Sequence, residues 1–259
     1  MVKWLTKLFA GAALAAVSVS AQEKPLVVGT ELLFPPFEML DAKGQPAGVS
    51  IDMMNAFGEF IHRAVQIQNI PFDGLIPSLK TGKVDLVISS MTVTEDRKKS
   101  IDFSDPYLKM GLSILVKKDS DIQSFNDLDK PEHHIVVKKG TTGHIYATQH
   151  FKSAKILVLN DSSSCAAEVS QGKADAFIYD QVSVYQHWKK YEETTRAILQ
   201  PFQEEEWAIG VRKGNDELRQ KINAFIKQFK ESGGFSKLGD KYFADSKKTF
   251  AELGIPFYF

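Results

Sequence analysis

A group of hydroxyl side chains follows an apolar stretch in the segment "VDLVISSMTVTEDRKKS". Ser89, Ser90 and Thr92 lie where the apolar stretch ends, and Arg97 follows five residues after Thr92. Arginine can meet a carboxylate with two parallel hydrogen bonds, and hydroxyls can complete such a shell. The segment therefore predicts a carboxylate site. The alternative is a surface arginine paired with a neighbouring Glu or Asp.

The same segment predicts how Arg97 is positioned. Thr94 is a favourable N-cap for "EDRKKS", and the acidic residues Glu95 and Asp96 suit a first helical turn. Arg97 would then occupy the first turn of a helix, close to the end of the preceding strand.

Two further segments place polar groups directly after apolar strands. In "VVKKGTTG", Thr141 and Thr142 offer hydroxyls at a helix start, where free amides favour an anion. This pattern also fits a plain strand–turn–helix connection with threonine as the cap. In "ADAFIYD", Asp180 ends an apolar strand, where an unpaired carboxylate would be costly. Asp180 could cap the next helix, or it could meet an ammonium group.

Aromatic residues provide candidate walls for a pocket. Glu31 and Phe34 follow the first predicted strand in "TELLFPPFE", and Phe72 precedes a helix in "PFDGLIPSL". Two aromatic rings could sandwich an aliphatic, amide or guanidinium group. Phe34 could equally be a core residue.

The elements that must position these groups alternate along the chain, which predicts an α/β fold. The predicted strands are continuous apolar runs, typical of parallel strands covered on both faces, and the predicted helices have apolar residues at about 3.6 spacing. The predicted strands span 25–32, 84–90, 133–140, 154–160 and 174–180, and the predicted helices span 49–64, 73–82, 165–172 and 216–232.

A weak internal repeat relates two of these units. "GKVDLVISS" begins at Gly82 and "GKADAFIYD" begins at Gly172, so Ser90 and Asp180 each stand eight residues after a glycine. Either two helix–strand connections are similar by chance, or two lobes each aim a polar group at one site. Ligands of open α/β sheets bind outside the carboxyl ends of the strands, which favours a site here.

Composition narrows the function classes. The chain has 32 Lys and Arg against 32 Asp and Glu, so charge gives no argument for nucleic-acid or membrane-surface binding. Cys165 is the one cysteine, and we expect a partly buried, unreactive side chain, with no metal or redox site. Residues 1–21 combine two lysines, a short apolar stretch and "SVSA", which predicts a cleaved secretory signal peptide.

Taken in order, these motifs resemble the periplasmic amino-acid-binding proteins of ABC transporters, the solute-binding protein family 3. This group includes histidine-, lysine/arginine/ornithine-, arginine- and glutamine-binding proteins. The resemblance spans nearly the whole mature chain, to about Tyr242, and rests on "GTELLFPPFE", "FDGLIPSLKTGKVDLVISSMTVTEDRKKSIDFSDPY", "KKGTTG", "GKADAFIYD" and "GVRKGNDELRQKINAFIKQFKESGGFSKLGDKYF".

The resemblance implies a type II binding-protein fold, with two α/β lobes around a ligand cleft and two crossing strands near "KMGLSILV" and "EEEWAIGV". The first lobe would comprise residues 22–110 and 208–259, and the second lobe residues 111–207. The tail "FADSKKTFAELGIPFYF" is longer than the usual family ending, and the lobe-one disulfide of some members has no counterpart.

The resemblance also implies roles for the candidate residues. Arg97 would hold the carboxylate of an amino acid, helped by Thr92 and Thr142. Asp180 would hold its ammonium, helped by the carbonyl of Ser90 and by Thr92. Phe34 and Phe72 would stack around the side chain, with Glu31 and Lys138 near its far end. The full predicted set is Glu31, Phe34, Phe72, Ser89, Ser90, Met91, Thr92, Arg97, Lys138, Thr141, Thr142 and Asp180.

The expected function is therefore capture of a polar amino acid, glutamine-like or arginine-like, in the periplasm. We expect a monomer that closes on its ligand and is recognised by a membrane permease, without cofactor, metal, catalysis or nucleic acid. Glu31 alone favours a cationic side chain, whereas Glu31 together with an inward-pointing Lys138 favours a neutral one. The alternative is an enzyme of the cyclohexadienyl (arogenate or prephenate) dehydratase type on the same fold. A receptor sensor domain is disfavoured, because the chain carries no signalling segment.

Overall fold

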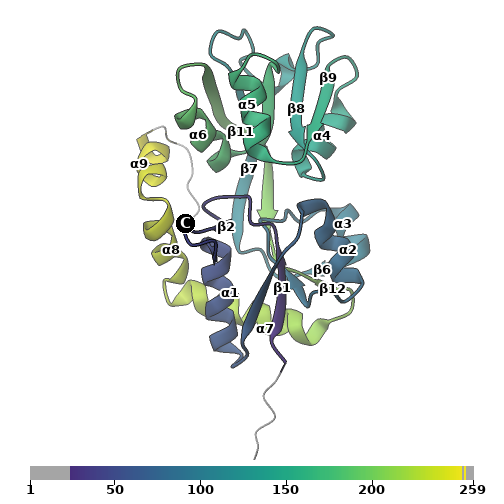
Figure 1. Cartoon of the computed structure of the whole chain (residues 1–259), viewed down its shortest axis with the longest axis vertical. Helices are drawn as coiled ribbons and strands as arrows, with labels where there is room; N and C mark the ends of the chain where they lie inside the picture. The colour runs from purple at the N-terminus through teal and green to yellow at the C-terminus, as the bar shows by residue number, and fades with distance from the viewer. Residues whose placement is uncertain (1–23, 253, 255–259) are drawn as a thin grey trace, which may run out of the picture.

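The chain folds into two lobes, which lie one above the other in Figure 1. The computed structural model describes residues 24–252 and residue 254, so the predicted signal peptide lies outside the described residues. Each lobe is built on a five-stranded sheet flanked by helices, which confirms the predicted α/β class. Within the described residues, every helix is too short or too polar to cross a membrane.

The first lobe contains a sheet with the strand order β4-β1-β5-β12-β6. β1 pairs in parallel with β4 and β5, whereas β12 is antiparallel to β5 and β6. The elements of this lobe are β1 (Leu26–Thr30), β2 (Met39–Leu40), β3 (Pro46–Ala47), α1 (Val49–Phe60), β4 (Val65–Asn69), η1 (Phe72–Gly74), α2 (Leu75–Lys80), β5 (Leu86–Val87), α3 (Glu95–Ser100), β6 (Ile101–Phe103), β12 (Gly210–Arg212), α7 (Asp216–Glu231) and α8 (Gly234–Tyr242).

The second lobe contains a sheet with the strand order β11-β7-β10-β8-β9. β8 pairs in parallel with β9 and β10, and β7 is antiparallel to β10 and β11. The elements of this lobe are β7 (Leu108–Lys117), η2 (Phe125–Asp127), β8 (His134–Lys138), α4 (Thr142–His150), β9 (Lys155–Leu159), α5 (Ser162–Ser170), β10 (Ala176–Asp180), α6 (Gln181–Lys190) and β11 (Thr195–Trp207).

Two long strands connect the lobes. β7 and β11 pair antiparallel, with Leu108 opposite Trp207 at the end nearer the first lobe. Figure 1 shows both strands running from one lobe into the other. Their pairing is interrupted between Ile198 and Gln203, where the register shifts. Such a connection allows the lobes to move relative to each other while both remain attached.

Two predicted elements end at least three residues earlier than their sequence pattern indicates, and each is followed by a residue with a positive φ. The helix predicted over 49–64 ends at Phe60, because His62 adopts a left-handed conformation with φ of 56°. The strand predicted over 84–90 is hydrogen-bonded as β5 over two residues, and Ser90 also has a positive φ, of 50°. Positive φ is rare for residues other than glycine and turns the chain out of a regular element. At Ser90 this turn carries the chain into the space between the lobes.

The carboxyl ends of the parallel strands face the space between the lobes. β1 and β5 end there in the first lobe, and β8 and β10 end there in the second lobe. The glycines of the sequence repeat, Gly82 and Gly172, have φ values of 75° and 71° after α2 and α5 and lead into β5 and β10. The two halves of the repeat therefore deliver equivalent strand ends to one region.

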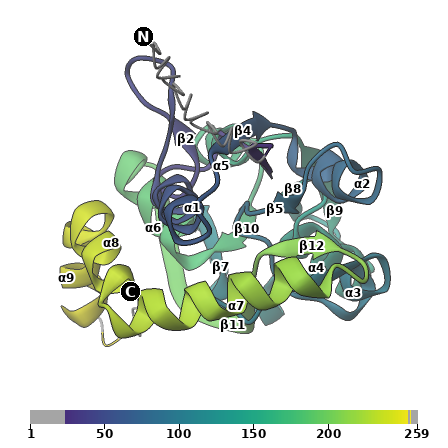
Figure 2. The same ribbon diagram turned by 90° about the horizontal axis from the view of Figure 1, so that it is seen from below.

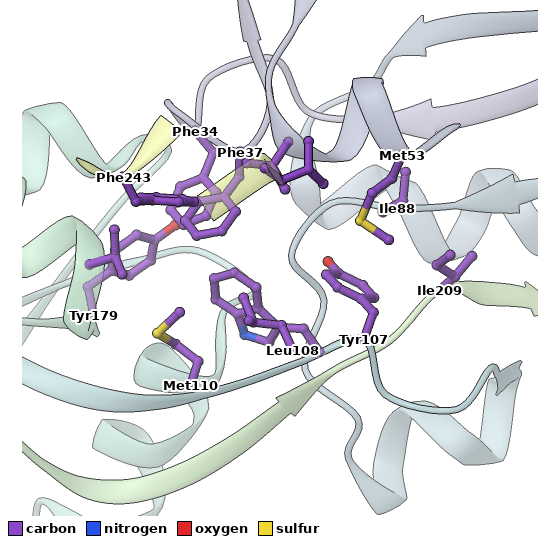
Figure 3. Close-up of a cluster of buried hydrophobic side chains, with 14 of the residues drawn as sticks. Phe34, Phe37, Met53, Ile88, Tyr107, Leu108, Met110, Tyr179, Ile209 and Phe243 are labelled. Carbon is purple, nitrogen blue, oxygen red and sulfur yellow. The ribbon is translucent and has the colours of Figure 1, made fainter. Parts of the chain in front are cut away.

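An apolar core continues from one lobe into the other alongside the connecting strands. Figure 3 shows Phe34 and Phe37 of the first lobe, Tyr179 of β10 and Met110 of β7 in one cluster with Phe243. The ring centroids of Phe37 and Phe243 lie 5.1 Å apart. Burial of aromatic rings stabilises such a cluster strongly, so this packing helps to hold the two lobes together beside the connecting strands.

The C-terminal extension forms a helix that contacts both lobes. α9 (Ala244–Glu252) follows α7 and α8 of the first lobe, as Figure 2 shows. Phe250 is 1% exposed and packs edge-on against Tyr185 of α6, with ring centroids 5.7 Å apart. The hydroxyls of Tyr185 and Thr249 are 3.0 Å apart and share a hydrogen bond. The extension thus ties the end of the first lobe to the second lobe.

We predict that Phe250→Ala weakens this connection. Truncating a buried phenylalanine costs about 3–5 kcal/mol in a core, although detachment of a terminal helix limits the loss. We expect a lower Tm and faster hydrogen exchange in α9 and at the facing end of α6. Lys248→Ala, an exposed change on the same helix, is the matched control. Equal exchange in both variants would show that the helix does not hold the lobes together.

Candidate functional site

A cavity lies between the lobes at the strand ends described above. Its walls come from both lobes and from the connecting strands. The residues that line it are Glu31, Phe34, Phe72, Ser89, Ser90, Thr92, Arg97, Leu112, Lys138, Thr141, Thr142, Tyr179, Asp180, Glu205 and Trp207. All of the predicted residues except Met91 are in this set. The side chain of Met91 is instead 1% exposed within the apolar core of the first lobe, so this side chain does not line the cavity.

Arg97 is held by α3 as the sequence predicts, and it points into the cavity. Thr94 caps the helix by accepting a hydrogen bond from the Arg97 amide at 3.2 Å. The guanidinium donates to the carbonyl of Thr92 at 2.7 Å and to the carbonyl of Gly140, in the second lobe, at 3.0 Å. The residue is 8% exposed, so the alternative of a surface ion pair is wrong.

The electrostatics of Arg97 leave it charged. Burial lowers the pKa of Arg97 to about 10, and the nearby carboxylate of Glu205 opposes this. The guanidinium lies over the ring of Phe72, 5.5 Å from its centroid. Two backbone carbonyls and a ring face occupy only part of a group with five N–H donors. Arg97 is therefore a buried, oriented cation that can still bind a carboxylate.

Glu31 and Lys138 form a buried ion pair across the two lobes. Lys138, at the end of β8, is 1% exposed and donates to Glu31, which follows β1. Glu31 also accepts a hydrogen bond from the amide of Phe72 at 3.1 Å. Lys138 thus points into the cavity, and the alternative that it faces solvent is wrong. The pair supplies both a donor and an acceptor while being neutral as a unit.

Asp180 combines the two roles that its sequence position allows. Oδ1 caps α6 by accepting a hydrogen bond from the amide of Ser183 at 2.9 Å. Oδ2 is buried and has no hydrogen-bond partner among the described residues. Burial raises the pKa of Asp180 to about 6, against the hydrogen bonds from Ser183. One oxygen therefore fixes the carboxylate in place, and the other is available to a cation in the cavity.

Thr141 and Thr142 divide the tasks at the start of α4. The Thr141 hydroxyl accepts from the amide of His144 at 3.4 Å and donates to the carbonyl of Lys138 at 2.7 Å. Thr141 is thus the helix cap of the plain strand–turn–helix alternative. Thr142 is the first residue of the helix and lines the cavity, at the end where free amides favour an anion.

Ser90 is held in its strained conformation by a residue that sequence reasoning missed. Its hydroxyl donates to the two carboxyl oxygens of Glu38, at 3.0 and 3.2 Å, and Glu38 also accepts from Ser50. Burial raises the pKa of Glu38 to about 8, so the group is mostly protonated at neutral pH. A neutral Glu38 can stay buried without a counter-ion, and it anchors the turn at the cavity edge.

Four other cavity residues were also missed: Leu112, Tyr179, Glu205 and Trp207. Glu205 and Trp207 lie two apart on β11, so they share one face of that strand. Three consecutive glutamates show no alternation in residue type, so the sequence carries no signal that would single out Glu205. Tyr179 packs edge-on against Phe34, with ring centroids 5.6 Å apart. Phe34 is thus both a core residue and a wall of the cavity.

The described residues contain no cluster of histidine, cysteine and acidic side chains that could hold a metal ion. The arrangement is instead that of a binding site for a small charged molecule. It presents one cation with free donors, one carboxylate oxygen without a partner, and one neutral ion pair, all between aromatic rings. The first two groups come from opposite lobes.

Comparisons with known proteins identify the family of this chain. Residues 26–245 match the model of the bacterial extracellular solute-binding proteins, family 3. A probable histidine-binding protein of Neisseria gonorrhoeae is 32% identical over 94% of this chain and 96% of its own length. Among solved structures, an ancestral amino-acid-binding protein described as a precursor of cyclohexadienyl dehydratase is 38% identical over 85% of this chain and 95% of that chain, with a TM-score of 0.78.

A second solved structure, an ancestral arginine-binding protein bound to glutamine, is 35% identical over 85% of this chain and 98% of that chain, with a TM-score of 0.79. The match to the family model covers most of the chain and includes every element from β1 to α8. The chain therefore belongs to family 3 of the bacterial extracellular solute-binding proteins.

Proposed function

We propose that this protein is the substrate-binding component of an amino-acid ABC transporter. The observation that carries this proposal is the pairing of Arg97 and Asp180 in one buried cavity. Arg97 offers free donors to a carboxylate, and Oδ2 of Asp180 offers an unpartnered acceptor to an ammonium. An α-amino acid is a zwitterion and satisfies both. Relatives named as amino-acid-binding proteins support this choice of ligand.

Lobe closure would be the mechanism. Arg97 contacts the carbonyl of Gly140 across the cleft, and Lys139 forms an ion pair with Asp73 at 2.7 Å, so the structure has the lobes in contact. A ligand that touches both lobes favours this closed form, because it binds the open form with fewer contacts. We infer that residues 22–110 and 208–259 move against residues 111–207, and that a membrane permease recognises the closed monomer.

The setting of this function would be the periplasm. The basic and apolar pattern of residues 1–21 supports export followed by cleavage after Ala21. Binding without catalysis is favoured over the dehydratase alternative, because the solved relative connected with that enzyme is described as an amino-acid-binding protein. Turnover of arogenate or prephenate by the purified protein would contradict this part of the proposal.

A thermal-shift screen of the twenty amino acids tests the proposal. A ligand that binds only the folded state raises Tm, and Arg97→Ala should abolish the shift while keeping the fold. Loss of one partner of a desolvated charge pair costs about 2–5 kcal/mol, a weakening of about 30-fold or more. Arg97→Lys, which keeps the charge but not the planar fork, should weaken binding less. An Arg97→Ala protein that binds as tightly as wild type would refute the carboxylate site.

We predict that acid weakens binding through Asp180. An ammonium needs the ionised carboxylate, and the pKa of Asp180 in the free protein is about 6. Affinity should therefore fall as the pH drops below about 6, because ligand binding must then displace a proton. In Asp180→Asn, affinity should be low and independent of pH over this range.

A deaminated analogue of the ligand provides the control for this prediction. It lacks the ammonium, so Asp180→Asn should affect it little. An equal loss for the amino acid and the analogue would leave Asp180 with the capping role alone.

The ion pair of Glu31 and Lys138 favours a neutral polar side chain such as that of glutamine. The two opposite charges compensate each other, so neither is left to attract a charged side chain. We predict that Lys138→Ala shifts the preference towards arginine. The change removes a like charge and leaves Glu31 to pair with the guanidinium, so the ratio of arginine to glutamine affinity should rise about tenfold or more. Titration calorimetry with both ligands measures this ratio.

Lys139→Ala is the matched control, because Lys139 is exposed and pairs with Asp73 outside the cavity. It should leave the ratio unchanged. An unchanged ratio in Lys138→Ala would show that the ion pair does not determine selectivity.

A further inference from the structure

Glu205 is a buried acid inside the cavity whose charge no predicted role explains. It is the middle residue of three consecutive glutamates on β11, and its neighbours Glu204 and Glu206 are exposed. Glu205 itself is 7% exposed and lines the cavity beside Trp207. Alternation along the strand directs this one glutamate inward.

Glu205 lies near both groups that would hold the ligand, Arg97 and Asp180. Its carboxylate accepts a hydrogen bond from the hydroxyl of Thr92 at 2.8 Å. Its charge acts on Arg97 and on Asp180, raising the pKa of each. The Thr92 hydroxyl has a single proton to donate, and that proton is directed at Glu205. Thr92 is therefore not free to donate to a ligand carboxylate while Glu205 is ionised.

The charges in the cavity do not balance around a zwitterion. Glu31 and Lys138 compensate each other. On the proposed function, the ligand carboxylate is met by Arg97 and the ligand ammonium by Asp180. The carboxylate of Glu205 then has no counter-ion of its own, and it lies near Arg97, where the ligand carboxylate would bind. Two carboxylates that share a desolvated site do not both remain ionised, and one of them takes up a proton.

We propose, on the basis of the function above, that Glu205 takes up one proton when the carboxylate of an amino acid binds at Arg97. The proton comes from the solvent or buffer and adds to a carboxylate oxygen of Glu205, and no covalent bond of the ligand changes. The neutral acid then donates its O–H to the ligand carboxylate. Glu205 thereby makes affinity depend on pH and favours ligands with a free carboxylate.

The surroundings of Glu205 favour this protonation. Burial raises the pKa of Glu205, and hydrogen bonds from Thr142 and Thr92 oppose the rise, as does Arg97. A second hollow lies next to the cavity, and Thr92, Thr142 and Glu205 line both of them. The other ionisable groups that line this hollow are Glu95, Asp96, Lys98, Tyr146, His150, Glu204 and Glu206. Glu95, Asp96 and Glu206 form ion pairs with Lys98, Lys99 and Lys109 at the surface, so burial is the main influence that favours the neutral form of Glu205.

The direction of the pH effect follows from linkage. Glu205 would have a higher pKa in the complex than in the free protein. The affinity of the protein for its ligand then falls as the pH rises from the lower of these pKa values to the higher. Asp180 acts in the opposite direction and at lower pH, because an ammonium stabilises its ionised form. Between pH 7 and 8.5 Asp180 is mostly ionised, whereas Glu38, whose pKa is about 8, also titrates. The contribution of Glu205 is therefore the difference between wild type and Glu205→Gln.

Calorimetry in buffers with different ionisation enthalpies counts the protons taken up on binding. The ligand is the amino acid with the largest shift in the thermal screen. Wild type should take up a substantial fraction of a proton, and its affinity should fall by up to about tenfold per pH unit. Glu205→Gln should take up a much smaller fraction and show a flatter profile than wild type. Glu204→Gln, the exposed neighbour, should behave as wild type.

A second ligand distinguishes this role from a structural one. The corresponding amine, which lacks the carboxylate, should bind wild type without proton uptake. Equal uptake in wild type and Glu205→Gln, or equal uptake with the amine, would overturn the proposal while leaving the proposed function intact. Failure of wild type to bind any amino acid would overturn the proposed function itself. If Glu205→Gln did not fold, the proton uptake of wild type with the amino acid and with the amine would still test the proposal.

Discussion

The central constraint on this structure is that charged groups lie out of water in one cavity between two lobes. A buried charge without a partner is costly, and partners must come from nearby elements or from a ligand. Lys138 meets Glu31 across the cleft, and Arg97 meets two carbonyls, one from each lobe. Glu38 avoids the cost by remaining protonated at neutral pH. Asp180 keeps one buried oxygen without a hydrogen-bond partner among the described residues, and burial raises the pKa of Glu205 in spite of its hydrogen bonds.

The same residues often serve the local fold and the cavity. Asp180 caps α6 with one oxygen and presents the other to the cavity. Thr94 caps the helix that carries Arg97, and Thr141 caps the helix that presents Thr142. Each capping hydrogen bond restricts the conformation of a side chain or of a helix start. The groups that would contact a ligand are therefore oriented before it binds. Preorganisation of this kind lowers the entropy lost on binding.

Contacts on several sides hold the lobes together. Aromatic rings pack at the base of the cavity, and α9 reaches from the first lobe to Tyr185 of the second. The helix α9 therefore adds to the contacts that join the two lobes.

The sequence alone determined the class of fold and most of the cavity. Apolar runs, glycines and caps specify local structure, so the strand ends that carry Ser90 and Asp180 and the helix start that carries Arg97 could be predicted. Tertiary structure decided what depends on distant partners. Lys138 points inward because Glu31, 107 positions away, meets it across the cleft. Met91 turns into the core, and Glu38 and Glu205 become cavity groups through contacts with Ser90 and Thr92. The direction and the protonation state of a side chain depend on burial and on partners far along the chain, so the local spacing of residues does not predict them.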